Sequence, residues 1–138
     1  MNDPKAHQHR TDIIRCKDHL FGGNTFFLLQ EMKRTGADQI IKEQIRSGKP
    51  YIGESAGSII LSPNIEYVKE MDDCSIAADL ENFDGLQIID FFPLPHYNCF
   101  PFKDAVEKII SLYKGSMDLK PITNSEVILV HDGDVQIS

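Results

Sequence analysis

The sequence lacks the two features that usually bring a protein to nucleic acids or membranes, an excess of basic residues and a long apolar run. It contains 14 Lys and Arg against 21 Asp and Glu, so its net charge is −7. Such a chain offers no extended basic surface to a phosphate backbone or an anionic membrane. No apolar run approaches the roughly 20 residues needed to cross a bilayer, and the first residues lack the apolar core of a signal peptide. We therefore expect a cytoplasmic protein whose partners include neither nucleic acid nor membrane.

The sequence also has few cysteines and none of the common nucleotide-binding motifs. Cys16, Cys74 and Cys99 are widely spaced and form no Cys-x-x-Cys. Reduced thiols that act as small packing residues are the expected state. Neither Gly-x-Gly-x-x-Gly nor Gly-Lys-Ser/Thr occurs, so a nucleotide site has little support. We expect no cofactor and no metal site.

Hydrophobic spacing and turn residues outline the domain organisation. Residues 1–11 are polar and expected to be frayed or disordered, whereas residues 12–138 form a single domain. Helices are predicted over residues 24–36, 38–47, 56–61 and 101–115. Strands are predicted over residues 12–21, 50–53 and 86–92, and a hairpin joins residues 127–130 and 135–137 through Asp132-Gly133. The acidic stretch 64–85 is expected to be a solvated loop with short helical pieces. This alternation predicts an α/β fold, with helices packed on a sheet.

The segment Gly53-Glu54-Ser55-Ala56-Gly57 follows one of the predicted strands and opens a predicted helix. Gly-x-Ser-x-Gly is either a loose turn or a nucleophile elbow, in which backbone strain exposes the serine oxygen above a sheet. The predicted strand, turn and helix meet the structural condition for an elbow. In an elbow Ser55 would be the nucleophile, and the N–H of Ala56 would help to form an oxyanion hole.

A nucleophilic serine needs a base, and His96 is the best placed of the five histidines. It follows a predicted strand end, where open α/β sheets build their sites, and flanking prolines stiffen its loop. The turn Gly22-Gly23 could supply the second oxyanion donor. Its alternative role is a tight turn before a helix, which could bind phosphate.

Three blocks of the sequence together resemble one family of serine peptidases. They are residues 22–29 (GGNTFFLL), 51–58 (YIGESAGS) and 95–97 (PHY). Their residues, order and rough spacing are similar to those of the dipeptidase E (aspartyl dipeptidase) and cyanophycinase family, from about residue 12 onward. The resemblance implies a fold like that of class I glutamine amidotransferases, a three-layer, mostly parallel sheet with helices on both faces. It also implies hydrolysis of dipeptides with an N-terminal aspartate through an acyl-enzyme.

The resemblance also implies roles for individual residues. It assigns the nucleophile, the base and the two oxyanion donors, in that order, to Ser55, His96, Gly23 and Ala56. For the carboxylate that orients the base, it favours Glu126 in a late turn over Glu70. The proline and glycine of the family's late turn are absent here.

The substrate site is less well defined by the sequence. Within the resemblance, we expect Gly22, Asn24 and Glu54 to contact a small peptide substrate. An aspartate side chain on that substrate needs a cation, for which Lys103 is a weak candidate. The oligomeric state stays open, and a homo-oligomer is one alternative.

Two departures from the family bear on this interpretation. Family members carry a longer N-terminal segment that supplies the first strands, and charges in residues 15–19 interrupt the apolar run before the glycine turn. We therefore expect an N-terminally truncated sheet. The alternative function is that of a truncated, non-catalytic member acting as a binding or partner-completed domain. Glutamine amidotransfer is disfavoured, because the elbow carries serine where that chemistry uses cysteine.

Overall fold

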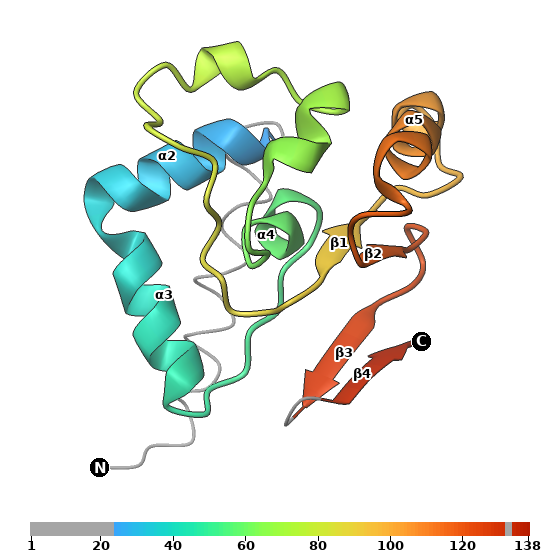
Figure 1. Ribbon diagram of the computed structural model, residues 1–138. Helices are drawn as coiled ribbons and strands as arrows, with labels where there is room; N and C mark the ends of the chain where they lie inside the picture. Colours follow the sequence, from blue (N-terminus) through green and yellow to red (C-terminus); the bar gives the residue numbers. More distant parts are fainter. Residues whose placement is uncertain (1–23, 132–133) are drawn as a thin grey trace.

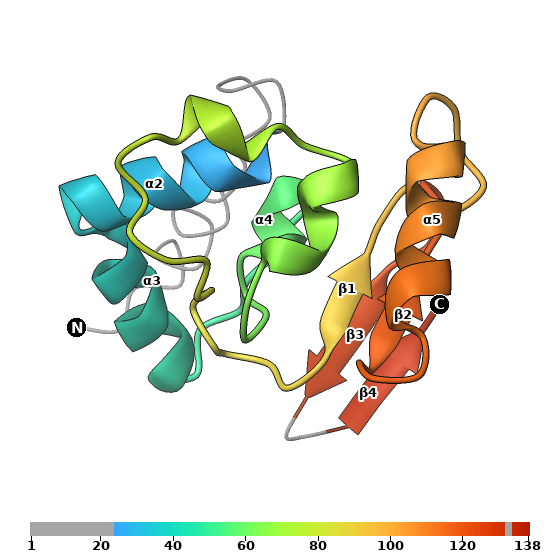
Figure 2. The same ribbon diagram turned by 45° about the horizontal axis from the view of Figure 1, so that its top comes forward.

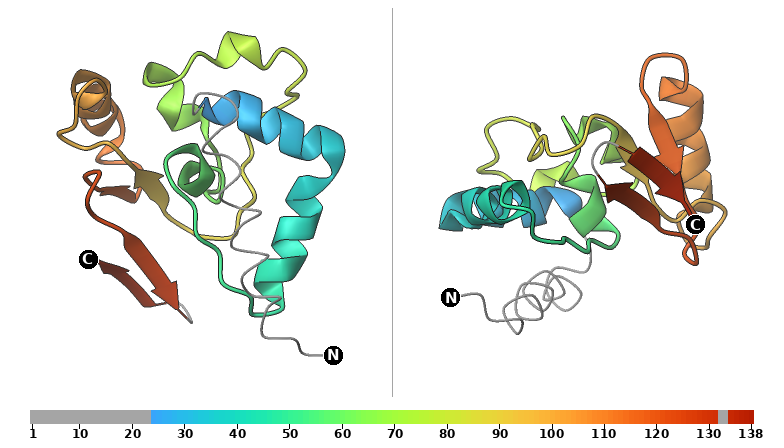
Figure 3. Two further views of the ribbon diagram at one scale, coloured as in Figure 1. Left: turned by 180° about the vertical axis from the view of Figure 1, so that it is seen from behind. Right: turned by 90° about the horizontal axis from the view of Figure 1, so that it is seen from below.

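The computed structural model describes residues 24–131 and 134–138 (Figure 1). In chain order its elements are α2 (Thr25–Thr35), α3 (Ala37–Arg46), α4 (Ala56–Ile59), the 3-10 helices η2 (Glu66–Glu70) and η3 (Cys74–Ile76), β1 (Phe92–Leu94), α5 (Lys103–Tyr113), β2 (Leu119–Pro121), β3 (Ile128–His131) and β4 (Asp134–Ile137). Turned forward, the molecule shows α4 between α2 and β1 (Figure 2). Views from behind and from below place the β3–β4 hairpin on the opposite side from α2 and α3 (Figure 3).

Helix α2 begins and ends where its capping residues predict. The Asn24 side chain accepts a hydrogen bond from the N–H of Phe27 at 2.9 Å, which satisfies one free donor of the first turn. Gly36 closes the helix in the left-handed conformation, with φ of 83°. Phe26 and Leu29 lie on one face and are fully buried. The predicted helices over residues 24–36 and 38–47 are therefore confirmed as α2 and α3.

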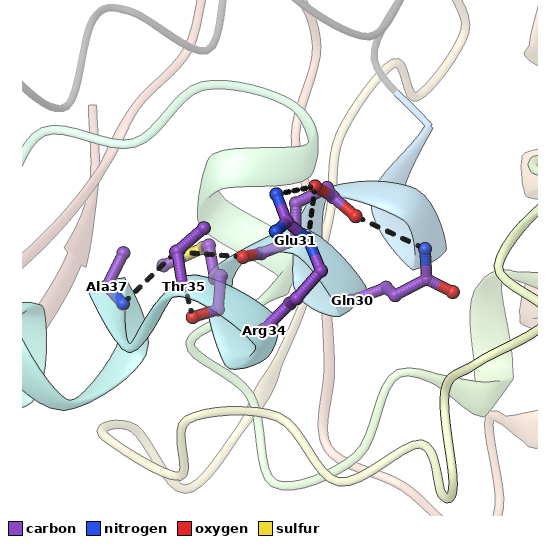
Figure 4. Close-up of polar contacts among 6 residues, drawn as sticks. Gln30, Glu31, Arg34, Thr35 and Ala37 are labelled. Carbon is purple, nitrogen blue, oxygen red and sulfur yellow. Dashed lines mark hydrogen bonds and ion pairs between the residues drawn. The ribbon is translucent and has the colours of Figure 1, made fainter.

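Polar side chains close the end of α2 and the turn into α3 (Figure 4). The hydroxyl of Thr35 donates to the carbonyl of Glu31 at 2.9 Å and accepts from the N–H of Ala37 at 3.4 Å. Arg34 donates twice to the Glu31 carboxylate, at 2.9 and 2.6 Å. These hydrogen bonds lower the pKa of Glu31. The pair is solvent-exposed, so we assign it little weight in stability.

The core includes residues that the sequence had placed in a solvated loop. Residues 64–85 do form the short helical pieces η2 and η3, but Ile65, Tyr67 and Val68 are buried against α4, β1 and α5 residues in one cluster. The Tyr67 hydroxyl donates to the carbonyl of Pro93, and its ring packs edge-on against Phe92. The expectation of a solvated segment is wrong, because apolar residues spaced through an acidic stretch turn inward, while its acids other than the half-buried Asp72 remain exposed.

The described strands form two separate pairs. β1 and β2 are parallel, with Phe92 opposite Leu119 and Leu94 opposite Pro121. β3 and β4 are antiparallel and confirm the predicted hairpin, whose Asp132-Gly133 turn lies outside the described residues, as does the predicted strand over 12–21. The parallel pair and the packed helices agree with the predicted α/β class.

Two predicted strands are wrong in whole or in part. Residues 50–53 belong to no strand, because no strand among the described residues pairs with them. Only the last residue of the predicted strand 86–92 lies in β1. The preceding backbone instead bonds to the end of α4, with the N–H of Leu86 donating to Ile60 at 2.7 Å and that of Ile88 to Leu61 at 3.0 Å. Gln87 adopts a positive φ of 59°, which interrupts extended geometry.

Across the described ranges, no helix is both long enough and apolar enough to span a membrane.

The N-terminus of α2 depends on a carboxylate from the segment after η2. Asp72 accepts from the N–H of Thr25 at 2.9 Å and from its hydroxyl at 2.7 Å. Because these bonds are charge-assisted and partly buried, we expect Asp72→Ala to lower the free energy of unfolding by about 1 to 2 kcal/mol. Urea unfolding measures this. Asp79→Ala, which removes an exposed carboxylate from the same segment, is the control and should change stability by less than about 0.5 kcal/mol. Equal effects of the two substitutions would contradict this role for Asp72.

Candidate active site

Ser55 lies in a strained backbone conformation at the start of α4. Its φ is 50° and its ψ is −118°, and the helix begins at the next residue. A non-glycine residue in such a region costs of order 1 to 3 kcal/mol and persists only where the surrounding structure enforces it. A nucleophile elbow requires a strained serine between a strand and a helix; here α4 follows Ser55, and no strand precedes it among the described residues.

Close backbone packing explains why glycine precedes the elbow. A Cβ on Gly53 would lie 2.5 Å from the carbonyl oxygen of Gly57 and 2.6 Å from the ring of Tyr51. The Tyr51 hydroxyl donates to that same carbonyl at 2.6 Å, and the Ser58 hydroxyl donates to the carbonyl of Ser55 at 2.7 Å. Burial raises the pKa of Tyr51 well above its usual range, so its hydroxyl remains a proton donor. Together these contacts hold the elbow.

His96 approaches Ser55 from the end of β1. Its Nε2 lies 2.9 Å from the Ser55 Oγ, across 41 residues of sequence. The residue has a φ of 69°, and its ring stacks on that of Phe102 with centroids 4.9 Å apart. Loop geometry and stacking therefore position the imidazole. The structure brings together the two residues that the motifs singled out.

Asn124 completes a chain of hydrogen bonds that the sequence did not predict. Its Oδ1 lies 2.8 Å from the Nδ1 of His96. A carbonyl oxygen can only accept, so Nδ1 carries the proton and Nε2 is left as the acceptor for the Ser55 hydroxyl. This is the tautomer in which a histidine can remove a proton from serine. The only signal in the sequence was the position of Asn124 in the late turn already under consideration.

Glu126, favoured by the resemblance to orient His96, lies elsewhere in that turn. Its carboxylate accepts from the N–H of Thr123 at 2.8 Å. Both imidazole nitrogens of His96 are bonded to Ser55 and Asn124, so the structure does not bring Glu126 to the base. Glu126 instead closes the turn that carries Asn124. The difference arises because the Glu126 carboxylate is taken up by the backbone of its own turn, whereas the Asn124 amide reaches the imidazole.

Glu70, the less favoured alternative, is also separate from His96. Its carboxylate pairs with the Nζ of Lys108 on α5, at 3.0 Å. This partly exposed pair joins η2 to α5 on the surface.

The predicted oxyanion donors are only partly within the described residues. Gly22 and Gly23 lie outside them. Ala56 is the first residue of α4, and in the described part of the chain no hydrogen bond takes up its N–H. An oxyanion hole requires such an N–H beside the serine, one that the described residues leave without an acceptor.

The other predicted substrate contacts have the following environments. The Asn24 amide caps α2 and also donates to the carbonyl of Asp73 at 3.1 Å, so both ends of this amide have partners within the protein. Glu54 is exposed, and its carbonyl accepts from the N–H of Gly57 at 2.8 Å. Lys103 is exposed at the start of α5. Among the described residues, no three His, Cys, Asp or Glu side chains gather as a metal site would require.

Comparisons with known proteins agree on one family. The sequence model of peptidase family S51 matches residues 5–138 of this chain. "Uncharacterized peptidase Lin0382" of Listeria innocua is 52% identical over 129 residues, which cover 92% of this chain and 62% of that protein. "Peptidase E" of Shewanella amazonensis is 38% identical over 101 residues, which cover 70% of this chain and 41% of that protein.

A solved structure shows the same similarity in three dimensions. The crystal structure of "a Putative Peptidase E Protein" from Listeria monocytogenes EGD-e superimposes with a TM-score of 0.78 at 50% identity. The match covers 83% of this chain and 55% of that chain. The chain thus spans less than two thirds of the length of the relatives described.

The strain at Ser55 predicts how its replacements rank in stability. Glycine adopts a positive φ at little cost, whereas alanine retains the steric conflict of serine. We expect the free energy of unfolding of Ser55→Gly to be about 1 kcal/mol higher than that of Ser55→Ala. Urea unfolding of the two variants tests this, with Ser111→Gly and Ser111→Ala on an exposed face of α5 as the matched pair. There alanine should be the more stable by about 1 kcal/mol. Finding alanine favoured at both positions would show that Ser55 is not strained.

Proposed function

Because this chain belongs to peptidase family S51, we propose that it is a serine-type peptidase whose nucleophile is Ser55. The observation that carries this proposal is the 2.9 Å contact between the Ser55 Oγ and the His96 Nε2 at a strained elbow. Membership of the family confirms the resemblance seen in the motifs. It supports peptidase chemistry, while the roles of individual residues are part of the proposal.

The proposed reaction follows the chain of hydrogen bonds. Ser55 attacks the amide carbonyl as His96 removes its proton, and Asn124 accepts from the Nδ1–H of the imidazolium. The negative oxygen of the tetrahedral intermediate binds the N–H of Ala56 and a second N–H, which we assign to Gly23. His96 then protonates the departing amine. In the second half of the reaction, His96 removes a proton from a water molecule as its oxygen attacks the acyl carbon, and then gives that proton to the Ser55 oxygen as the acyl–oxygen bond breaks.

An amide in the third position has a definite chemical consequence. Asn124 can fix the tautomer and orientation of His96, but it contributes no negative charge to stabilise the imidazolium. A Cys-His-Asn arrangement achieves orientation in the same way in papain-like peptidases. We therefore propose a triad of Ser55, His96 and Asn124, with Glu126 supporting the turn rather than the base.

The proposal extends to the substrate and to the whole sheet. The resemblance implies dipeptides with an N-terminal aspartate, whose side-chain carboxylate requires a cation that Lys103 or residues outside the described ranges would supply. It also implies the three-layer, mostly parallel sheet of class I glutamine amidotransferases. The parallel β1–β2 pair, with α4 beside β1, supports that arrangement.

A fluorophosphonate probe tests the nucleophile directly, because it reacts with serines that a neighbouring base activates. We expect specific labelling of the wild type and its loss in Ser55→Ala and His96→Ala. Asn124→Ala should slow labelling by about 10-fold to 100-fold, since the imidazole loses its orientation. Ser111→Ala is the control and should label at the wild-type rate. A folded wild-type protein that resists the probe would refute the hydrolase and leave the non-catalytic binding domain as the better interpretation.

A panel of dipeptides tests the substrate. We expect Asp-Leu to be hydrolysed faster than Asn-Leu and Ala-Leu. Asn-Leu matches it in size but lacks the charge, and Ala-Leu lacks both the size and the charge. The measurement is amine release per active serine, with the active fraction counted by the probe. Comparable rates for Asp-Leu and Asn-Leu would remove the aspartate preference while leaving the serine mechanism intact.

A further inference from the structure

Cys99 connects the turn that carries His96 to the turn that carries Asn124. Its thiol donates to the carbonyl of Tyr97 at 3.2 Å and accepts from the backbone N–H of Asn124 at 3.4 Å. Its own N–H donates to the carbonyl of His96 at 3.1 Å. One side chain therefore spans the two segments whose side chains meet 2.8 Å apart at the His96 Nδ1.

Asn124 needs such support because it lies on an exposed turn. The start of that turn is held by Ile122, whose N–H donates to Leu94 at 3.0 Å and whose carbonyl accepts from Tyr97 at 2.9 Å. Its far end is held by Glu126 on the N–H of Thr123. Within the described ranges, the Cys99 sulfur is the partner of the Asn124 backbone itself.

We propose that Cys99 is a positioning residue. By binding the backbone N–H of Asn124, its sulfur holds the side-chain amide of Asn124 at the Nδ1 of His96. The effect on catalysis rests on the function proposed above, whereas the effect on the geometry of His96 does not. A thiol is a weak donor and a weak acceptor, and this position uses both capacities. Alanine removes both. Serine keeps both, although its shorter C–O bond brings the oxygen less far toward its partners.

The first experiment is a double-mutant cycle on probe labelling, with thermal unfolding recorded for every variant. We expect Cys99→Ala to slow labelling about fivefold, and Cys99→Ser to recover part of that loss. In an Asn124→Ala background, Cys99→Ala should cause no further slowing, because the side chain that it positions is gone. Cys74→Ala, which removes the other partly buried thiol of the described residues, should leave the rate unchanged.

Two outcomes of this cycle overturn the proposal. One is an unchanged labelling rate in folded Cys99→Ala. The other is the same fold-loss with and without Asn124, which is the result expected if Cys99 merely stabilises the fold.

The second experiment reads the geometry without any turnover. Nitrogen-15 NMR of the histidine side chains, at a pH where the imidazole is neutral, distinguishes the two tautomers, and His96→Ala assigns the signal. We expect the wild type and Cys74→Ala to hold the proton on Nδ1, and Cys99→Ala to shift the population toward Nε2–H. An unshifted tautomer in Cys99→Ala overturns the proposal. If the wild type resists the probe, the proposed peptidase function is refuted. The NMR measurement of the His96 tautomer still decides the role of Cys99 in that case.

Discussion

The parallel pairing of β1 with β2 is the constraint on which the candidate site depends. With Leu94 opposite Pro121, both strands end at the same edge of the pair. His96 follows two residues after one end, and Asn124 follows three residues after the other. Their side chains can therefore meet although 28 residues separate them. A slip of one residue in this register would turn alternate side chains to the other face and separate the imidazole from the amide.

Ser55 contacts His96 at this edge and is itself held in a strained backbone conformation. Ser55 adopts a conformation that is costly for any residue with a side chain, and Gly53 admits no Cβ. Both are tolerated because α4 is enclosed by the core and because Tyr51 and Ser58 bond to the elbow carbonyls. The serine is thus positioned by packing around a short helix rather than by a preceding strand of the described chain.

The sequence was most informative where a residue type is chemically irreplaceable. The caps of α2, the glycine-flanked serine and a histidine after a strand end each have a local signature, and Ser55 and His96 do lie in contact. Asn124, the third member of the chain of hydrogen bonds, has no such local signature. An amide and a carboxylate both accept a hydrogen bond, and the late turn carries both Asn124 and Glu126. The strand expected over residues 50–53 failed because three apolar residues define no period, and strand formation needs a neighbour that local sequence does not reveal. The acidic segment 64–85 was predicted wrongly because its polar composition obscured four residues that lie in the core, namely Ile65, Tyr67, Val68 and Ala77.

Two hydrogen-bonded tyrosine hydroxyls, those of Tyr51 and Tyr67, give the fold an optical signature. The sequence has no tryptophan and four tyrosines, so tyrosine dominates its near-ultraviolet absorption. Burial raises the pKa of both Tyr51 and Tyr67 above the ordinary value near 10. We expect their phenolate bands to emerge at higher pH than those of ordinary tyrosines, unless the fold opens first. Absorbance near the phenolate band therefore reports the opening of the fold around Tyr51 and Tyr67 in a protein that carries no added label.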